Sequence, residues 1–151
     1  MATTNQLGEK SDHFSGWGSY GFGSHGQTTI VDIAPALSGE VGKVTNKDSG
    51  NYDGEIATGV SGYNLNKNES ITFSAYVKGD GNTIGKTGYI WIYKSNGTNT
   101  ISTGTSFIFT ANWQRVSHTI TWTYDNPGTT STSCYVRCNR AQNEFFYISN
   151  C

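Results

Sequence analysis

Apolar and polar side chains alternate along several short stretches of this chain, the pattern of β-strands whose two faces meet different environments. The clearest example is residues 88–95, where three aromatic residues face one way and two isoleucines face the other. The aromatic residues are Tyr89, Trp91 and Tyr93, and the isoleucines are Ile90 and Ile92. Isoleucine suits a packed core, whereas three rings with polar tips form a flat outer platform. We therefore expect one strand with a core face and an aromatic face.

Similar alternation predicts short strands along most of the chain. They cover residues 28–34, 41–45, 55–60, 71–78, 89–94, 100–109, 113–124, 134–138 and 145–148. Turn signals such as Asp80-Gly81 and Asn96-Gly97 separate them, which favours antiparallel neighbours. In the 113–124 run, the expected core side carries Val116, His118, Ile120, Trp122 and Tyr124. Short strands at this spacing predict an all-β fold, a two-sheet antiparallel β-sandwich of jelly-roll type.

Composition supports one β domain. The chain has 151 residues, 19 of them glycine, with 13% aromatic and 14% charged residues. This length suits a single core, and no segment shows a sustained 3.6-residue apolar repeat. Residues 1–13 are polar and unpatterned and are expected to form a flexible N-terminal leader. Residues 14–151 are expected to form the single β-sandwich domain.

Charge and hydropathy exclude two classes of partner. Ten basic residues against eleven acidic ones give a net charge of -1, without the basic clusters that nucleic-acid binding needs. No apolar run reaches the roughly 20 residues that cross a bilayer. The polar opening residues lack the features of a signal peptide, so synthesis in a cytoplasm is expected. The protein could still reach the outside of the cell by either of two routes. One is release by cell lysis, and the other is cleavage from a longer exported protein.

Three features resemble cofactor or metal sites. Residues 16–21 match G-x-G-x-x-G, but no strand precedes them and no helix follows, so a dinucleotide site is rejected. Cys134 and Cys138 lie about 13 Å apart on a regular strand, so they are expected to be buried thiols, while Cys151 could pair with another chain. The acidic stretch 48–55 is either a solvated turn or a structural calcium site. No other cofactor is expected.

No catalytic constellation is found, and the chain is expected not to be an enzyme. Glycoside hydrolysis needs two carboxylates about 5 to 9 Å apart, whereas the acidic residues here fall mostly in turns. Gly59-Val-Ser61-Gly62 does not match G-x-S-x-G, the motif that carries the nucleophile of many serine hydrolases. His118 lies on an otherwise apolar face, where a hydrogen-bonded structural histidine is expected.

Three segments of the sequence resemble segments of the carbohydrate-binding modules of families 4, 9 and 22. They are residues 70–78 (SITFSAYVK), 111–119 (ANWQRVSHT) and 146–150 (FYISN), in the same order and spacing. The resemblance covers most of residues 14–150 and implies a jelly-roll sandwich. Similar modules occur in glycoside hydrolases and in bacteriophage tail or capsid-attached proteins. The unpaired cysteines and the opening sequence favour a phage.

The resemblance implies a sugar-binding sheet face. The matching carbohydrate-binding residues are Trp91, Tyr89 and Tyr93, with Tyr76, Arg137 and Tyr135 as neighbours. Trp113 matches a tryptophan that packs within the fold. Family members often hold a structural calcium ion with an aspartate in the last strand, where this chain has Ser149.

Two functional hypotheses follow. In the first, the aromatic face of a non-catalytic module binds a glycan or polysaccharide for host attachment, on a virion or otherwise outside the cell. In the second, the same face docks another virion protein as a structural assembly module, or forms a homo-oligomer. A third possibility is purely structural, with the rings covered by the leader or by a loop.

Overall fold

The fold is known from a computed structural model, which describes residues 26–46, 55–60, 64–129, 132–138 and 143–151. These residues contain nine strands and no helix. The strands are β1 (Gly26–Val31), β2 (Val41–Asn46), β3 (Glu55–Val60), β4 (Ser70–Gly79), β5 (Thr87–Ser95), β6 (Thr100–Ile108), β7 (Gln114–Thr121), β8 (Thr132–Cys138) and β9 (Phe145–Ser149). The all-β prediction is confirmed. The described part of the chain also offers no helix that is long and apolar enough to cross a membrane.

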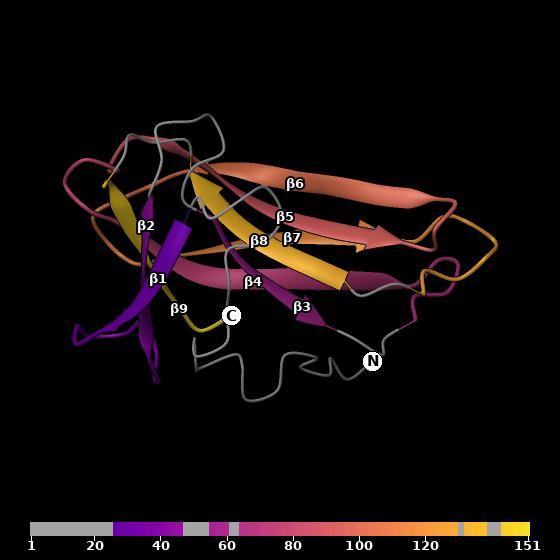
Figure 1. Cartoon of the computed structure of the whole chain (residues 1–151), viewed down its shortest axis with the longest axis horizontal. Helices are drawn as coiled ribbons and strands as arrows, with labels where there is room; N and C mark the ends of the chain where they lie inside the picture. Colours follow the sequence, from indigo (N-terminus) through magenta and orange to yellow (C-terminus); the bar gives the residue numbers. More distant parts are fainter. Residues whose placement is uncertain (1–25, 47–54, 61–63, 130–131, 139–142) are drawn as a thin grey trace.

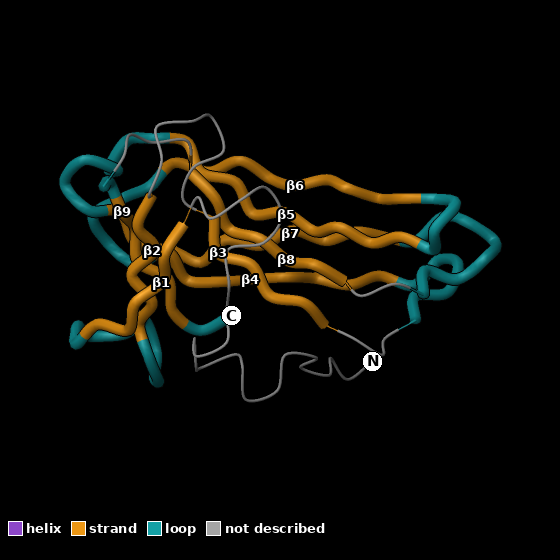
Figure 2. Tube along the Cα trace, in the orientation of Figure 1, coloured by secondary structure: helices purple, strands orange, loops and turns teal. Residues whose placement is uncertain are grey.

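The strands form two antiparallel sheets packed face to face (Figures 1 and 2). One sheet has five strands in the order β1-β2-β9-β4-β7, and the other has four in the order β3-β8-β5-β6. Figure 1 shows β4, β5, β6 and β7 running along the long axis, while β1, β2 and β9 cross it more steeply at one end. The predicted two-sheet sandwich is therefore confirmed, and neighbours in each sheet are often distant in sequence.

The core lies between the sheets and follows the predicted alternation. In β4, Phe73, Ala75 and Val77 are buried, and in β5 the buried pair is Ile90 and Ile92. Strands β7, β8 and β9 add further buried side chains, namely Val116, Ile120, Cys134, Val136, Cys138, Phe146 and Ile148. These strands therefore give alternate residues to one shared apolar layer, and burial of that layer is the main force that holds the sheets together.

Two predicted strands end three residues earlier in the structure. Strand β1 stops at Val31, and the chain then leads to Pro35, a residue that cannot donate a ladder hydrogen bond. Strand β7 stops at Thr121, yet Trp122 is fully buried and its indole Nε1 donates to the Asn126 carbonyl oxygen at 2.8 Å. Alternation correctly placed the Trp122 side chain in the core, although the backbone there is no longer strand.

The cysteine prediction is confirmed where the structure describes it. Cys134 and Cys138 are buried in β8, and neither they nor Cys151 form a disulfide. Burial raises the pKa of the Cys134 thiol to about 12, an effect partly offset by Lys94. Lys94 is itself fully buried, and burial lowers its pKa from the ordinary lysine value. Cys134 therefore stays protonated and unreactive at neutral pH.

Two calls fall outside the described residues. The leader over 1–13 and the glycine-rich aromatic stretch that follows it belong to residues 1–25, and most of the acidic stretch 48–55 belongs to 47–54. Among the described residues, no group of three His, Cys, Asp or Glu side chains could hold a metal ion. Ser149, at the position where an aspartate is common, accepts from the Ala36 amide at 3.4 Å and donates to Asn150 Oδ1 at 2.7 Å. Its hydroxyl thus anchors the loop between β1 and β2.

His118 joins the two sheets where their edge strands meet. It lies in β7, at the edge of one sheet, and it bonds to two threonines of β6, at the edge of the other. The Thr103 hydroxyl lies 2.8 Å from Nε2, and the Thr105 hydroxyl lies 2.9 Å from Nδ1. Both ring nitrogens are satisfied, as expected for a structural histidine. Burial lowers the pKa of His118, so the neutral ring is the form that the folded protein favours.

Protonation of His118 should therefore weaken the fold. Because its pKa is lower in the folded chain than in the unfolded chain, unfolding becomes easier as pH falls through the ordinary histidine range near 6.5. We expect the melting temperature of the wild type to fall between about pH 7.5 and about pH 5.5. His118→Gln should flatten this slope, which calorimetry at several pH values would measure. An unchanged slope would contradict the assignment.

Candidate carbohydrate-binding face

Five of the six predicted site residues lie together on the outer face of the four-stranded sheet. The aromatic residues of β5 point away from its buried isoleucines and are half-buried. Strand β8 pairs with β5 so that Arg137 lies opposite Tyr89 and Tyr135 lies opposite Trp91. On the other side of β5, the outward positions of β6 are Ser102, Gly104 and Ser106. The rings of β5 thus extend over about 13 Å of strand, flanked by polar side chains on both neighbours.

Trp91 lies against a glycine of the neighbouring strand. Gly104 pairs with Trp91, and a Cβ atom added to it would lie 2.3 Å from Trp91 Cε3 and 2.4 Å from the Ile90 carbonyl oxygen. No side chain of any size fits there. The indole Nε1 also donates to the Ser102 hydroxyl at 3.0 Å. The absence of a side chain at Gly104 and this hydrogen bond together hold the indole over β6.

Arg137 reaches the same rings from the opposite side of β5. Its guanidinium carbon lies 4.9 Å from the centroid of the Trp91 ring and 5.6 Å from that of Tyr89. A guanidinium over an aromatic face is attracted by the negative charge of the π-system, an interaction of about 0.5–1 kcal/mol at exposed sites. Arg137 is therefore held next to the Trp91 and Tyr89 rings, with its N–H donors beside the platform.

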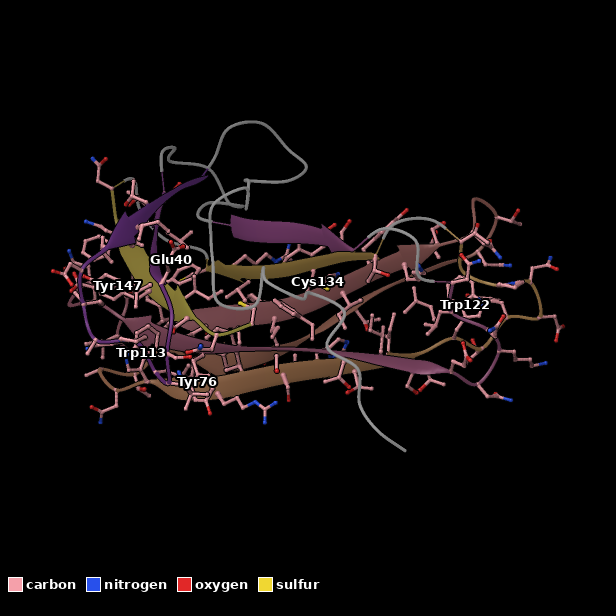
Figure 3. All side chains as sticks on the ribbon, turned by 90° about the horizontal axis from the view of Figure 1, so that it is seen from below. Glu40, Tyr76, Trp113, Trp122, Cys134 and Tyr147 are labelled. Carbon is pink, nitrogen blue, oxygen red and sulfur yellow. The ribbon has the colours of Figure 1, made fainter. Side chains whose placement is uncertain are left out.

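The expectation that Tyr76 neighbours the aromatic residues of β5 is wrong. Tyr76 lies in β4 of the other sheet, where it pairs with Arg115 of β7 and with Ser149 of β9. Its side chain is on the outer face of the five-stranded sheet, so the core separates it from Trp91. Figure 3 shows Tyr76, Trp113 and Tyr147 at the same end of the sandwich. Alternation assigns a residue to a face of its strand, but it does not say which sheet the strand joins.

Trp113 has the structural role that the resemblance implies. It is half-buried just before β7, and its Nε1 donates to the Ala34 carbonyl oxygen at 3.1 Å. Ala34 belongs to the loop between β1 and β2, the loop that Ser149 and Asn150 also hold. This tryptophan therefore fixes a loop over the five-stranded sheet and is not part of the aromatic platform.

The serines and the glycine of β6 were not among the predicted site residues. Nothing in that strand alone marks Gly104 as the residue beneath Trp91, because the relation depends on the pairing of β5 with β6. The Asn96-Gly97 turn was the available signal, since a tight hairpin there fixes the register of these two strands. Ser102 and Ser106 are exposed, and they supply hydroxyl groups beside the rings.

The chemistry of this face suits binding. Strands β5, β6 and β8 contain no aspartate or glutamate, so they offer no carboxylate pair for glycoside hydrolysis. They offer flat rings, serine hydroxyls and one guanidinium. Rings stack on the apolar C–H faces of sugars, while hydroxyl and guanidinium groups bond the sugar hydroxyls.

Replacing Gly104 by alanine should displace Trp91. The new methyl group would overlap both the indole and the Ile90 carbonyl, so we expect a loss of about 1–3 kcal/mol in the free energy of unfolding. Denaturant unfolding measures the loss. Gly81→Ala is a matched control, because a Cβ there meets nothing within 4 Å. Equal effects of the two substitutions would show that Trp91 does not rest on Gly104.

Comparison with known proteins gives matches at the level of structure. No protein-family model matches the sequence, and no curated protein matches it either. The CBM22-2 xylan-binding domain from Paenibacillus barcinonensis Xyn10C superposes with a TM-score of 0.65 at 14% identity, covering 92% of this chain and 91% of that chain. A structure described as Family 16 Carbohydrate Binding Module-2 gives 0.59 at 19% identity, covering 91% and 89%.

A phage protein shares the same architecture. The enzymatically active domain of the bacteriophage CBA120 tailspike protein 4 gives a TM-score of 0.60 at 11% identity. The match covers 98% of this chain but only 20% of that one. At these identities the likeness concerns the fold. This chain therefore has the β-sandwich fold of the carbohydrate-binding modules of the 4, 9 and 22 group.

Proposed function

We propose that this chain is a non-catalytic carbohydrate-binding domain that binds a glycan or polysaccharide through the outer face of β5, β6 and β8. The observation that carries the proposal is the seating of Trp91, whose indole lies against Gly104 and is fixed by Ser102. A pyranose ring stacks on Trp91, and Tyr89, Tyr93 and Tyr135 extend the contact along and across the strand. Arg137 and the serines of β6 bond the sugar hydroxyls.

The proposal extends to a location on a bacteriophage virion, in a tail or capsid-attached protein that contacts host or environmental glycans. Its support is the likeness to the tailspike domain together with the buried cysteines of β8, which form no disulfide and so need no oxidising compartment. Repeated copies on a particle would convert modest affinity per site into firm attachment, because neighbouring sites stay bound while one dissociates.

Trp91→Ala tests the binding face. We expect the affinity for a glycan that the wild type selects from an array to fall by about 30-fold or more, the usual effect of removing a central aromatic contact. The melting temperature should fall by only a few degrees, because the ring lies outside the core. Calorimetric titration and thermal unfolding of the same samples give both quantities.

Tyr147→Ala is the matched control, since it removes a half-buried ring from the outer face of the other sheet. It should leave glycan affinity within about twofold of the wild type. If the wild type binds no glycan but forms a defined oligomer that Trp91→Ala dissociates, the face is an assembly surface. If Trp91→Ala unfolds the chain, Trp91 is a structural residue and the proposed face is wrong.

A further inference from the structure

Arg137 determines the charge of the aromatic face. The three strands that form this face contain two charged residues, Lys94 and Arg137, and no acidic residue. Lys94 is fully buried in the core, so it presents no charge at the surface. Arg137 is half-buried on the outer face, beside the rings. A ligand that lies on Trp91 therefore meets a cation at its edge, and the described residues of these strands place no carboxylate against it.

The guanidinium of Arg137 is placed to bond a substituent of a sugar that contacts the aromatic residues of β5. Arg137 enters from β8, whereas the indole of Trp91 leans over Gly104 of β6. The guanidinium lies over both Trp91 and Tyr89, within 5.6 Å of each ring centroid. The guanidinium is thus a charged group within reach of a sugar that contacts these rings. Guanidinium is planar and matches a carboxylate with two parallel hydrogen bonds.

We propose that this face selects acidic polysaccharides, those whose pyranose rings carry a carboxylate, over neutral ones. The inference rests on the proposed sugar-binding function and adds its ligand class. Arg137 donates to the uronate carboxylate while the ring of that sugar packs along the aromatic side chains of β5. Charge-assisted hydrogen bonds are roughly twice as strong as those between neutral groups, so the carboxylate gains more from Arg137 than a hydroxyl does.

The test compares two polymers with the same sugar backbone, unesterified homogalacturonan, whose carboxylates are charged, and fully methyl-esterified homogalacturonan, whose carboxyl groups are neutral esters. We expect the wild type to bind the acidic form about tenfold more tightly in low salt, with the ratio shrinking as salt is raised. Arg137→Gln should bring the ratio to about one. Arg115→Gln is the control, because it removes an exposed arginine from the other sheet, and it should keep the tenfold ratio.

Arg137→Lys keeps the charge without the planar fork, and it should give a ratio of about threefold. It also serves if Arg137→Gln does not fold, which thermal unfolding would reveal. Polyglutamate serves as a non-sugar polyanion and should bind at least tenfold more weakly than acidic homogalacturonan. Equal affinity of the wild type for the two homogalacturonans, a ratio unaffected by Arg137 substitution, or equal binding of polyglutamate would overturn the inference.

The same experiment distinguishes a wrong ligand class from a wrong sugar-binding function. If the wild type binds neutral glycans through Trp91 and shows no preference for the acidic polymer, the ligand class is wrong while the sugar-binding face stands. If neither homogalacturonan nor any glycan of an array binds, both proposals fail together.

Discussion

The alternation of side chains along β5 is the constraint on which the sandwich and its outer face both depend. Every residue of this strand faces either the core or the surface, because successive side chains point to opposite sides of a pleated sheet. Ile90 and Ile92 fill the core, and Trp91 between them has to lie outside. A shift of one residue in register would exchange the two sets, burying the polar tips of the tyrosines. Core formation therefore fixes the aromatic face.

The neighbours of β5 turn an exposed row of rings into an ordered surface. Gly104 removes a side chain where the indole needs room, and Ser102 accepts from its nitrogen. Arg137 lies over two of the rings from the other side. Strand β6 is in turn held to the opposite sheet by His118, which bonds the threonines on either side of Gly104. The support for Trp91 thus extends through β6 to the far sheet.

Much of this could be predicted from the sequence because strand alternation is local. The core side of β4, β5 and β7, the buried thiols of β8 and the two-sheet class all follow from patterns within ten residues or so. The pairing of strands is not local. Tyr76 was grouped with Trp91 because both face outward from β-strands, yet β4 and β5 belong to different sheets. The pairing of β4 with β9 and of β5 with β8 decides which sheet each strand joins. Side-chain alternation carries no information on these pairings.

The same reasoning explains why the pattern along β6 alone does not reveal the glycine beneath Trp91, whereas Arg137 could be named. Arg137 is conspicuous as the one basic side chain at an outward position of its strand, so a resemblance or a charge count draws attention to it. Gly104 has no side chain, and its importance comes entirely from what its partner strand places against it. A binding face on a sheet is therefore defined by pairs across strands. Its conspicuous residues can be predicted from one strand, but the residues that hold them in place can be recognised only once the register is known.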